Sequence, residues 1–462
     1  MKTWVTKDLA CYAVETRFED YPGEVIGKAK MFILDSIGCM LGGCQTSLGK
    51  AIVTPIRSMG GNGEATIVGG GGKVPTIQAA LVNGTTANAL DYDDTLLGIG
   101  HPGASIISAA LAIGEWKHAS GRDLINAVLI GYDIGNRIGK AIQPSYERLQ
   151  NVKGSGTWFT FSAVVAAGKM LNLDLDYMLN ALGVAGATAP LPCAQKWGWD
   201  IEERPIHWVK EPTGWPAWTG ATAAILASHG FVGNRYILDG DNGFWIMAGS
   251  DQCDFEEMTR GLGQEYEIEN MTIKPYSSCR WQHAALDCVE DLKKTYKLTP
   301  EEIRTITVHS FGWVKRQEIY GPTQMVDAEF CIPHTVSMVL LGYHPGPSWY
   351  TDENFKSERV LNLSKKVKVE IDPEMDRAYF EEDKLSARVE IVTEKGEKLE
   401  RFVDIPKGDP LNPLTDQEIE EKFRNQASYS VKEEEIETVI RKIYDLENID
   451  DISDLMVSLA GK

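Results

Sequence analysis

A short polar stretch in the first quarter of the chain contains three carboxylates within four positions, Asp91, Asp93 and Asp94. Carboxyl groups this close oppose one another's ionisation, which raises the pKa of at least one of them unless a cation or a metal compensates. His101 follows, directly before an apolar segment that begins at Pro102. An imidazole beside carboxylates of shifted pKa is what proton transfer near neutral pH requires. The alternative is that these polar residues only cap a helix.

A second polar stretch, residues 274–283, also leads into a predicted helix and is rich in cations. Lys274 and Arg280 could neutralise carboxylates, Arg280 in a bidentate manner, although a solvated surface charge is the alternative for each. Cys279 and His283 could move a proton. An unpaired cysteine is, however, more often buried and inert, and His283 could simply be a polar residue at a helix start.

The elements that must position these residues are mainly helical before residue 265. Apolar residues recur at helical spacing over residues 25–41, 105–116, 122–141, 161–171 and 219–229. In the segment 122–141, Gly131, Gly135 and Gly139 lie four residues apart on one helix face. The missing side chains should let a second helix approach that face closely.

After about residue 268 the pattern changes to the alternation of half-buried strands. A helix over 283–294 precedes predicted strands at 305–309, 366–371, 387–393 and 399–403. We therefore expect a mainly α protein, with a large all-helical domain formed by residues 1–268 and 409–462 and a smaller α+β lid domain formed by residues 269–408. Thr415 and Glu418 form a capping-box pattern where the acidic C-terminal helical tail begins.

Composition narrows the classes of partner and cofactor. Lys and Arg number 46 and Asp and Glu 66, a formal net charge of −20, which repels polyphosphates and anionic membrane surfaces. We expect no nucleic acid, no membrane and, because the N-terminal residues lack the apolar run of a secretory signal, a cytoplasmic protein. The eight cysteines and eight histidines show no zinc-site spacing, and no nucleotide-binding motif is present. The sequence thus gives little support for a metal site and implies no nucleotide cofactor, and we expect a protein without a cofactor.

The two polar stretches together resemble the MmgE/PrpD family. Members carry a pattern like N-G-x-x-x-H-x-L-D-x-D-D-T followed by H-P-[GS], and later K-P-Y-x-x-C-R-x-x-H, which residues 83–95, 101–103 and 274–283 match. The resemblance extends over nearly the whole chain. It implies a helical domain built from both chain ends, a smaller α+β lid, a homodimer, and metal-independent chemistry on small di- or tricarboxylates. Family activities include 2-methylcitrate dehydration, cis-aconitate decarboxylation and iminodisuccinate epimerisation.

Position by position, the resemblance places five residues in the active site: Asp91, Thr95, His101, Lys210 and Lys274. Three positions depart from the family pattern. Asn88 stands where the first pattern has its His, Lys153 where many members have another His, and His334 where members commonly have a Tyr after Ile-Pro. The acid and base groups usual for the family are therefore altered.

The candidate residues converge on removal of a C–H proton next to a carboxylate, with cations stabilising a carbanion-like transition state. We expect Asp91, His101, Lys274, His334 and Lys153 to be catalytic, and Thr95, Lys210, Cys279, Arg280 and His283 to bind the small carboxylate substrate. The leading hypothesis is a cofactor-independent lyase, in particular a hydro-lyase. Its alternatives are an epimerase, isomerase or decarboxylase on a related polycarboxylate, a metal-dependent hydratase, and a catalytically idle binding protein.

Overall fold

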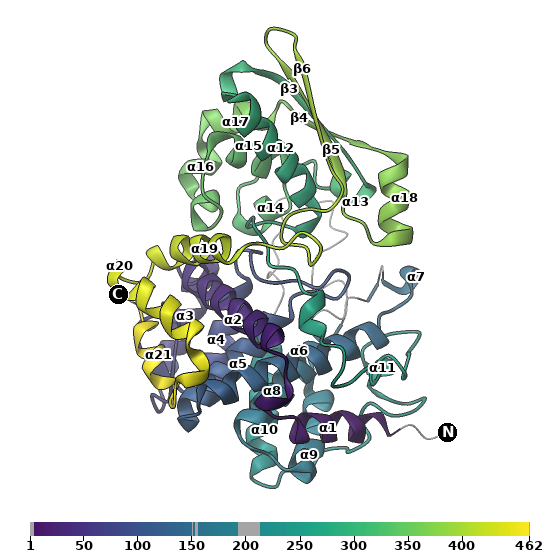
Figure 1. Ribbon diagram of the computed structural model, residues 1–462, viewed down its shortest axis with the longest axis vertical. Coiled ribbons are helices and arrows are strands. Elements are labelled where there is room, and N and C mark those ends of the chain that lie inside the picture. Colours follow the sequence, from purple (N-terminus) through teal and green to yellow (C-terminus); the bar gives the residue numbers. More distant parts are fainter. Residues whose placement is uncertain (1–3, 150, 153–155, 193–212, 462) are drawn as a thin grey trace.

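The computed structural model describes residues 4–149, 151–152, 156–192 and 213–461. In Figure 1 a helical body occupies the lower part of the molecule, and a smaller domain with a four-stranded sheet lies above it. The predicted fold class, a large helical domain with a smaller α+β domain, is confirmed.

The helical body is a set of closely packed helices around an aliphatic core. Its first part comprises α1 (Val5–Glu15), α2 (Gly23–Gly43), α3 (Ser47–Met59), α4 (Thr76–Asn88), α5 (Pro102–Lys117), α6 (Gly121–Ala141), α7 (Tyr146–Leu149), α8 (Phe159–Met170), α9 (Leu175–Thr188), α10 (Gly214–Ser228) and α11 (Phe244–Met247). Helices α5, α6 and α8 are buried along most of their length and form the centre of the body. Each of the five segments predicted from helical periodicity lies in or overlaps one of these helices.

The predicted glycine face on α6 is where α8 packs. A Cβ atom added at Gly135 would lie 1.5 Å from Oγ of Ser162 on α8, and one at Gly131 would lie 2.6 Å from Cγ2 of Ile106 on α5. Neither distance leaves room for a methyl group. The glycines therefore permit a helix contact that any larger side chain would prevent.

The smaller domain is built on a mixed sheet with strand order β4-β3-β5-β6. The strands are β3 (Ile303–Ser310), β4 (Val367–Ile371), β5 (Ala387–Thr393) and β6 (Lys398–Val403), with β4 parallel and β5 antiparallel to β3. Alternate residues of β5 are buried, as the alternation in the sequence predicts. The helices of this domain are α12 (His283–Tyr296), α13 (Gly312–Lys315), α14 (Met325–Glu329), α15 (Ile332–Leu341), α16 (Asp352–Lys356), α17 (Glu358–Ser364) and α18 (Pro373–Glu382).

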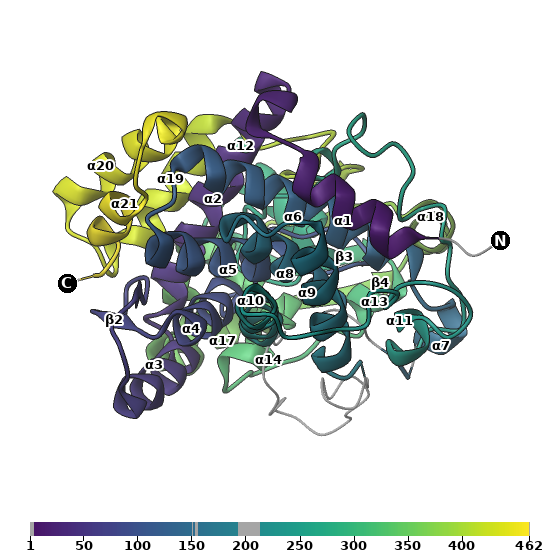
Figure 2. The ribbon, with the colours of Figure 1, turned by 90° about the horizontal axis from the view of Figure 1, so that it is seen from below.

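The chain crosses between the two parts twice, near residues 268–276 and again near 404–415, and the two connections touch. Gly408 has a φ of +89°, and a Cβ atom there would lie 2.0 Å from the carbonyl oxygen of Ile273. The last helices, α19 (Asp416–Ser428), α20 (Glu433–Tyr444) and α21 (Ser453–Ser458), then return to the helical body, where α19 packs against α2 (Figures 1 and 2).

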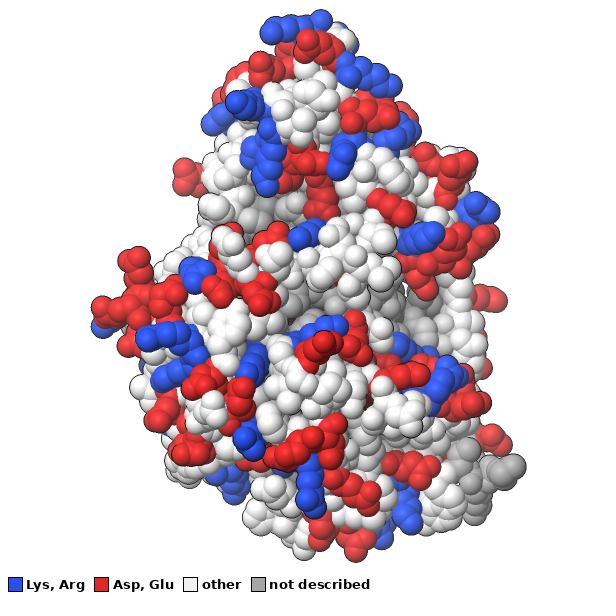
Figure 3. All heavy atoms as spheres, viewed as in Figure 1, with Lys and Arg blue, Asp and Glu red and all other residues white. Residues whose placement is uncertain are grey.

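The surface carries charges of both signs, interspersed over the face shown in Figure 3. No helix in the described part of the chain combines the length and the apolar composition needed to cross a membrane.

Substituting Gly135→Ala should destabilise the protein by about 1–3 kcal/mol, because the new methyl group has no space between α6 and α8. Urea denaturation measures the change. Gly27→Ala in α2 is the matched control, since nothing lies within 4 Å of its added Cβ and alanine favours a helix by about 0.5–1 kcal/mol. Equal effects of the two substitutions would contradict the close packing of α6 on α8.

Candidate active site

The carboxylate stretch forms a buried loop between α4 and α5. Asp91, with a φ of 47°, adopts the left-handed conformation that Asp tolerates better than most residues. This turn places Asp91, Asp93 and Asp94 inside the protein, each no more than 3% exposed. Asn88, at the position of the family His, donates a hydrogen bond from Nδ2 to Oδ1 of Asp93 at 2.9 Å. Asn88 thus helps to satisfy one of the buried carboxylates.

His101 lies at the N-cap of α5, and both nitrogens of its ring face oxygen atoms. Nδ1 donates to the carbonyl oxygen of Asp94 at 2.8 Å and also lies 3.2 Å from Oδ1 of Asp93. Nε2 lies 3.4 Å from Oδ1 of Asp91. Because a carbonyl oxygen can only accept, Nδ1 carries a proton, and a second proton on Nε2 would face the Asp91 carboxylate. The imidazole is thus held with Nδ1 toward the main chain and Nε2 toward the Asp91 carboxylate.

Lys274 joins the carboxylate loop from the first connection between the two parts. Its ammonium is 2.5 Å from Oδ1 of Asp91 and donates to the carbonyl oxygen of Asp91 at 2.9 Å. Thr95 and Thr272 exchange two backbone hydrogen bonds of 3.0 Å, which hold this connection against the loop. The side chain of Thr95 donates to the carbonyl oxygen of Gly100 at 3.2 Å. Asp91, His101 and Lys274 therefore form one contiguous buried cluster.

The pKa of Asp94 is raised, as expected for at least one of the three carboxyl groups, but burial contributes more than crowding. Burial raises the pKa of its carboxyl group to about 7, with the charge of Asp93 adding to the effect. Tyr132 on α6 donates to Oδ2 of Asp94 at 2.8 Å, and the backbone N–H of Gly103 donates to Oδ1 at 3.2 Å. Asp94 therefore changes charge near neutral pH, one carbonyl group away from His101.

Arg280 and His283, two predicted substrate-binding residues, face the second connection between the two parts. The guanidinium of Arg280 donates to the carbonyl oxygens of Lys407 at 2.7 Å and Pro406 at 3.2 Å, and lies 3.8 Å from Oδ2 of Asp409. His283 contacts Nη1 of Arg280 through Nδ1 at 3.2 Å, and burial lowers its pKa well below the ordinary value. A substrate carboxylate would have to compete with these carbonyl groups for Arg280.

Cys279 is buried, and Nε2 of Gln317 donates to its sulfur at 3.3 Å. Burial raises the pKa of the thiol to about 11, so the thiol is neutral at physiological pH. A buried thiol of this kind is a poor nucleophile and a weak acid.

His334 comes from α15 of the smaller domain. Its Nε2 donates to the carbonyl oxygen of Trp349 at 2.9 Å, and burial lowers its pKa to about 4. The ring stacks on that of Tyr350, whose hydroxyl donates to the carbonyl oxygen of Ser277 within the second polar stretch. The neutral imidazole of His334 and the phenol of Tyr350 therefore lie together, next to the polar stretch that contains Lys274. The sequence interpretation missed Tyr350, because no motif links it to the Ile-Pro-His stretch.

Two further predicted residues, Lys153 and Lys210, lie outside the described residues. Their roles stay predictions.

The sequence interpretation missed an ion pair that lies next to the cluster of Asp91, His101 and Lys274. Lys422 on α19 forms a buried ion pair with Asp35 on α2, at 2.5 Å between Nζ and Oδ1. Asp35 was visible as a charge within an apolar helix, but nothing near it in the sequence points to a partner on the last helices.

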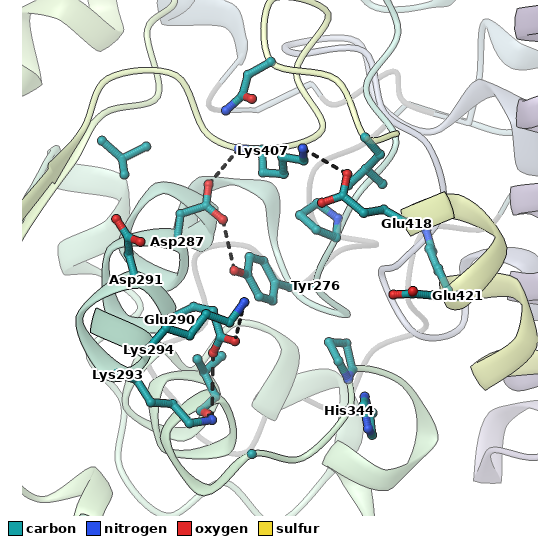
Figure 4. A pocket seen from close by; sticks show the side chains of 18 of the residues that line it. Tyr276, Asp287, Glu290, Asp291, Lys293, Lys294, His344, Lys407, Glu418 and Glu421 are labelled. Atoms are coloured by element: carbon teal, nitrogen blue, oxygen red, sulfur yellow. Dashed lines mark hydrogen bonds and ion pairs between the residues drawn. The ribbon is translucent and has the colours of Figure 1, made fainter. Parts of the chain in front are cut away.

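A cavity of about 1040 Å³ opens between α12, β6 and α19 (Figure 4). Its charges are largely paired: Lys407 with Glu418 at 2.9 Å and Lys294 with Glu290 at 3.1 Å. None of the predicted site residues within the described chain lines it, although Tyr92 and Pro275, the neighbours of Asp91 and Lys274, do. The cavity thus adjoins the cluster, but the predicted catalytic residues of the described chain do not line it.

The raised pKa of Asp94 predicts a pH-dependent stability difference. Between about pH 4 and pH 7 the folded protein keeps a proton on Asp94 that the unfolded chain has released. The contribution of this neutral carboxyl group to the free energy of unfolding is therefore complete below pH 4 and is lost as the pH rises through 7. Asp94→Asn cannot ionise. The unfolding free energy of the wild type should therefore fall relative to the variant, by up to about 4 kcal/mol, across this range in urea titrations. A difference that does not vary with pH would exclude the shifted pKa.

Comparison with known proteins identifies the family. The sequence models of the MmgE/PrpD N-terminal domain and the MmgE/PrpD C-terminal domain match residues 7–256 and 276–446. A cis-aconitate decarboxylase-like protein of Aspergillus oryzae is 28% identical, over 99% of this chain and 98% of its own length. The cis-aconitate decarboxylase of Aspergillus terreus is 26% identical, over 98% and 96%.

A more distant relative, a probable 2-methylcitrate dehydratase of Saccharomyces cerevisiae, is 22% identical over 87% of this chain and 81% of its own length. These relatives carry the names of enzymes, so the prediction of an enzyme is confirmed. Both family domains match in order and together span most of the chain, and this protein therefore belongs to the MmgE/PrpD family.

Proposed function

We propose that this protein is a cofactor-independent lyase that acts on a small tricarboxylate and moves a proton at a carbon next to a carboxylate. The observation that carries the proposal is the position of His101, which has an oxygen atom opposite each ring nitrogen and Lys274 bound to the same Asp91 carboxylate. An imidazolium held in this way is a proton donor whose orientation is fixed before the substrate arrives.

Loss of carbon dioxide is the outcome that this arrangement favours. In cis-aconitate, the electrons of the breaking bond to the leaving carboxylate form a new terminal double bond, and the electrons of the old double bond take up a proton at the vinylic carbon. His101 supplies that proton and Asp91 stabilises the imidazolium before transfer. Carbon dioxide leaves, and an unsaturated dicarboxylate with a terminal methylene group remains. The names of the relatives support the same outcome.

Lys274 is placed to stabilise charge on the substrate. Among the described residues, its ammonium makes hydrogen bonds to two oxygen atoms of Asp91, so one of its three N–H groups is available for a substrate carboxylate. The negative charge that develops on the neighbouring carbon spreads onto the oxygens of a retained carboxylate, where a fixed cation in a buried site lowers the energy of the transition state. Such a local cation is needed because the net charge of −20 repels a tricarboxylate.

Loss of water, placed first on sequence grounds, is the second candidate. It requires an unprotonated base to remove a C–H proton and a separate acid for the departing hydroxide. The neutral ring of His334 donates from Nε2 to the carbonyl oxygen of Trp349 and keeps Nδ1 unprotonated, but burial lowers its pKa to about 4, which makes it a weak base. The probable 2-methylcitrate dehydratase among the relatives keeps dehydration as the alternative.

A divalent cation at this cluster would compete with groups already in place. Asp91, Asp93 and His101 each offer a ligand atom within 4.8 Å of the others. The ammonium of Lys274 lies 2.5 Å from the Asp91 oxygen, however, and Asn88 donates to Asp93. A metal ion would face a fixed positive charge at the shortest contact of the cluster, so we propose metal-independent chemistry.

His101→Gln should lower kcat by roughly 100-fold or more, because glutamine cannot supply the proton. His118→Gln is the matched control, since His118 is exposed and bonded to Asp451 on the surface. Both variants should melt near the wild-type temperature by circular dichroism. A folded His101→Gln variant with wild-type turnover would exclude this mechanism.

Proton NMR of the purified protein with cis-aconitate, and separately with 2-methylcitrate, identifies the reaction. We expect the terminal methylene signals of a decarboxylated product from cis-aconitate, at the same rate after exhaustive treatment with EDTA. Water loss from 2-methylcitrate without turnover of cis-aconitate would establish the dehydratase instead. Loss of activity on chelation would show that a metal takes part, and no reaction with either substrate would contradict the lyase proposal.

A further inference from the structure

Lys422, on one of the last helices, makes two hydrogen bonds and one buried ion pair next to the cluster of Asp91, His101 and Lys274. The ammonium of Lys422 is 2.5 Å from Oδ1 of Asp35 and donates to the carbonyl oxygens of Tyr92 at 2.7 Å and Lys274 at 2.9 Å. The carboxylate and the two carbonyl groups come from three segments far apart in the sequence. The side chain of Lys422 is 4% exposed and that of Asp35 is 1% exposed, so water competes little for these bonds.

The two carbonyl groups belong to the segments that carry the reactive pair. Tyr92 directly follows Asp91, and Lys274 is the residue whose ammonium binds Asp91. Lys422 thus holds the main chain on both sides of the ion pair, and its ammonium also lies 3.9 Å from the centre of the Tyr92 ring. The distance between Asp91 and Lys274 is set by the main chain that Lys422 clamps, as well as by their own attraction.

The Lys422–Asp35 ion pair is held in place by the two helices that carry these residues. Lys422 lies on α19, which packs against α2 at the boundary between the helical body and the smaller domain (Figure 1). Asp35 lies in the middle of α2, among residues that are buried on all sides. A charge anchored on two packed helices moves little, which is what a group that positions others requires.

We propose that Lys422, anchored by Asp35, is a positioning residue that sets the geometry of Asp91, Lys274 and His101 for the proposed lyase reaction. The inference rests on that proposed function for its kinetic consequence. Its structural consequence is independent of it: without Lys422 the Asp91 loop shifts relative to Lys274, and the carboxylate that faces Nε2 of His101 shifts with it.

Lys422→Met removes the ammonium and keeps much of the side-chain length. We expect kcat on the accepted tricarboxylate to fall by roughly 10- to 100-fold, with KM changed by less than about twofold, because misplaced groups stabilise the transition state less while the binding cations remain. The matched control is Lys30→Met. Lys30 is also a buried lysine that links α2 to the C-terminal segment, through the carbonyl oxygen of Tyr444 and the carboxylate of Glu447, and it does not touch the cluster. This control should keep the wild-type kcat.

A second readout needs no turnover. The ring proton signal of His101, assigned by its loss in His101→Gln, is followed by NMR as the pH is changed. Lys422→Met should shift the midpoint of this titration, and Lys30→Met should leave it unchanged. A failure of all variants and the wild type to turn over substrate would overturn the proposed function, whereas an unshifted His101 titration in folded Lys422→Met would overturn the positioning role.

Lys422→Met leaves the buried carboxylate of Asp35 without its cation, which destabilises the folded state of this variant. If that variant does not fold, the double variant Asp35→Asn with Lys422→Met removes both charges and is tested by the same two readouts. Wild-type kcat and an unshifted His101 titration in the double variant would also overturn the proposal.

Discussion

The buried contact between Lys274 and Asp91 is the constraint on which the site depends. An ammonium and a carboxylate removed from water lose hydration that their mutual attraction restores only at close range and with their other donors and acceptors satisfied. The two residues belong to a loop of the helical body and to the first connection between the two parts. The ion pair can form only when these two segments lie side by side. The site therefore exists only when the two parts of the fold are assembled.

Several features of the fold hold Asp91 and Lys274 in contact. The exchange of backbone hydrogen bonds between Thr95 and Thr272 aligns the two segments, and Lys422 binds carbonyl groups on both. The second connection is fixed to the first where Gly408 approaches the carbonyl of Ile273, a contact that only glycine allows. Arg280 binds the carbonyls of the second connection. The residues that join the two parts are therefore neighbours of the residues that would perform the chemistry.

Local signals in the sequence predicted most of the fold. Periodicity found α2, α5, α6 and α8, and the face of α6 was read correctly because Gly135 and its neighbours repeat at the helical spacing. The cluster of Asp91, His101 and Lys274 was also anticipated, since its two halves are compact motifs. The binding partner of Arg280 could not be predicted from the sequence. An arginine before a helix looks the same whether its partner is a substrate or, as in the structure, a carbonyl group of a distant connection. Lys422 and Tyr350 could not be found, because a contact between segments far apart leaves no mark in a single sequence.

The central claim is that His101 delivers a proton to a substrate carbon, and the position of deuterium in the product tests it most directly. The reaction of cis-aconitate in D2O, analysed by NMR, should place one deuterium on the carbon that was vinylic and none on the new terminal methylene group. A product with no deuterium at that carbon, or with deuterium at the terminal methylene instead, would contradict proton delivery by His101.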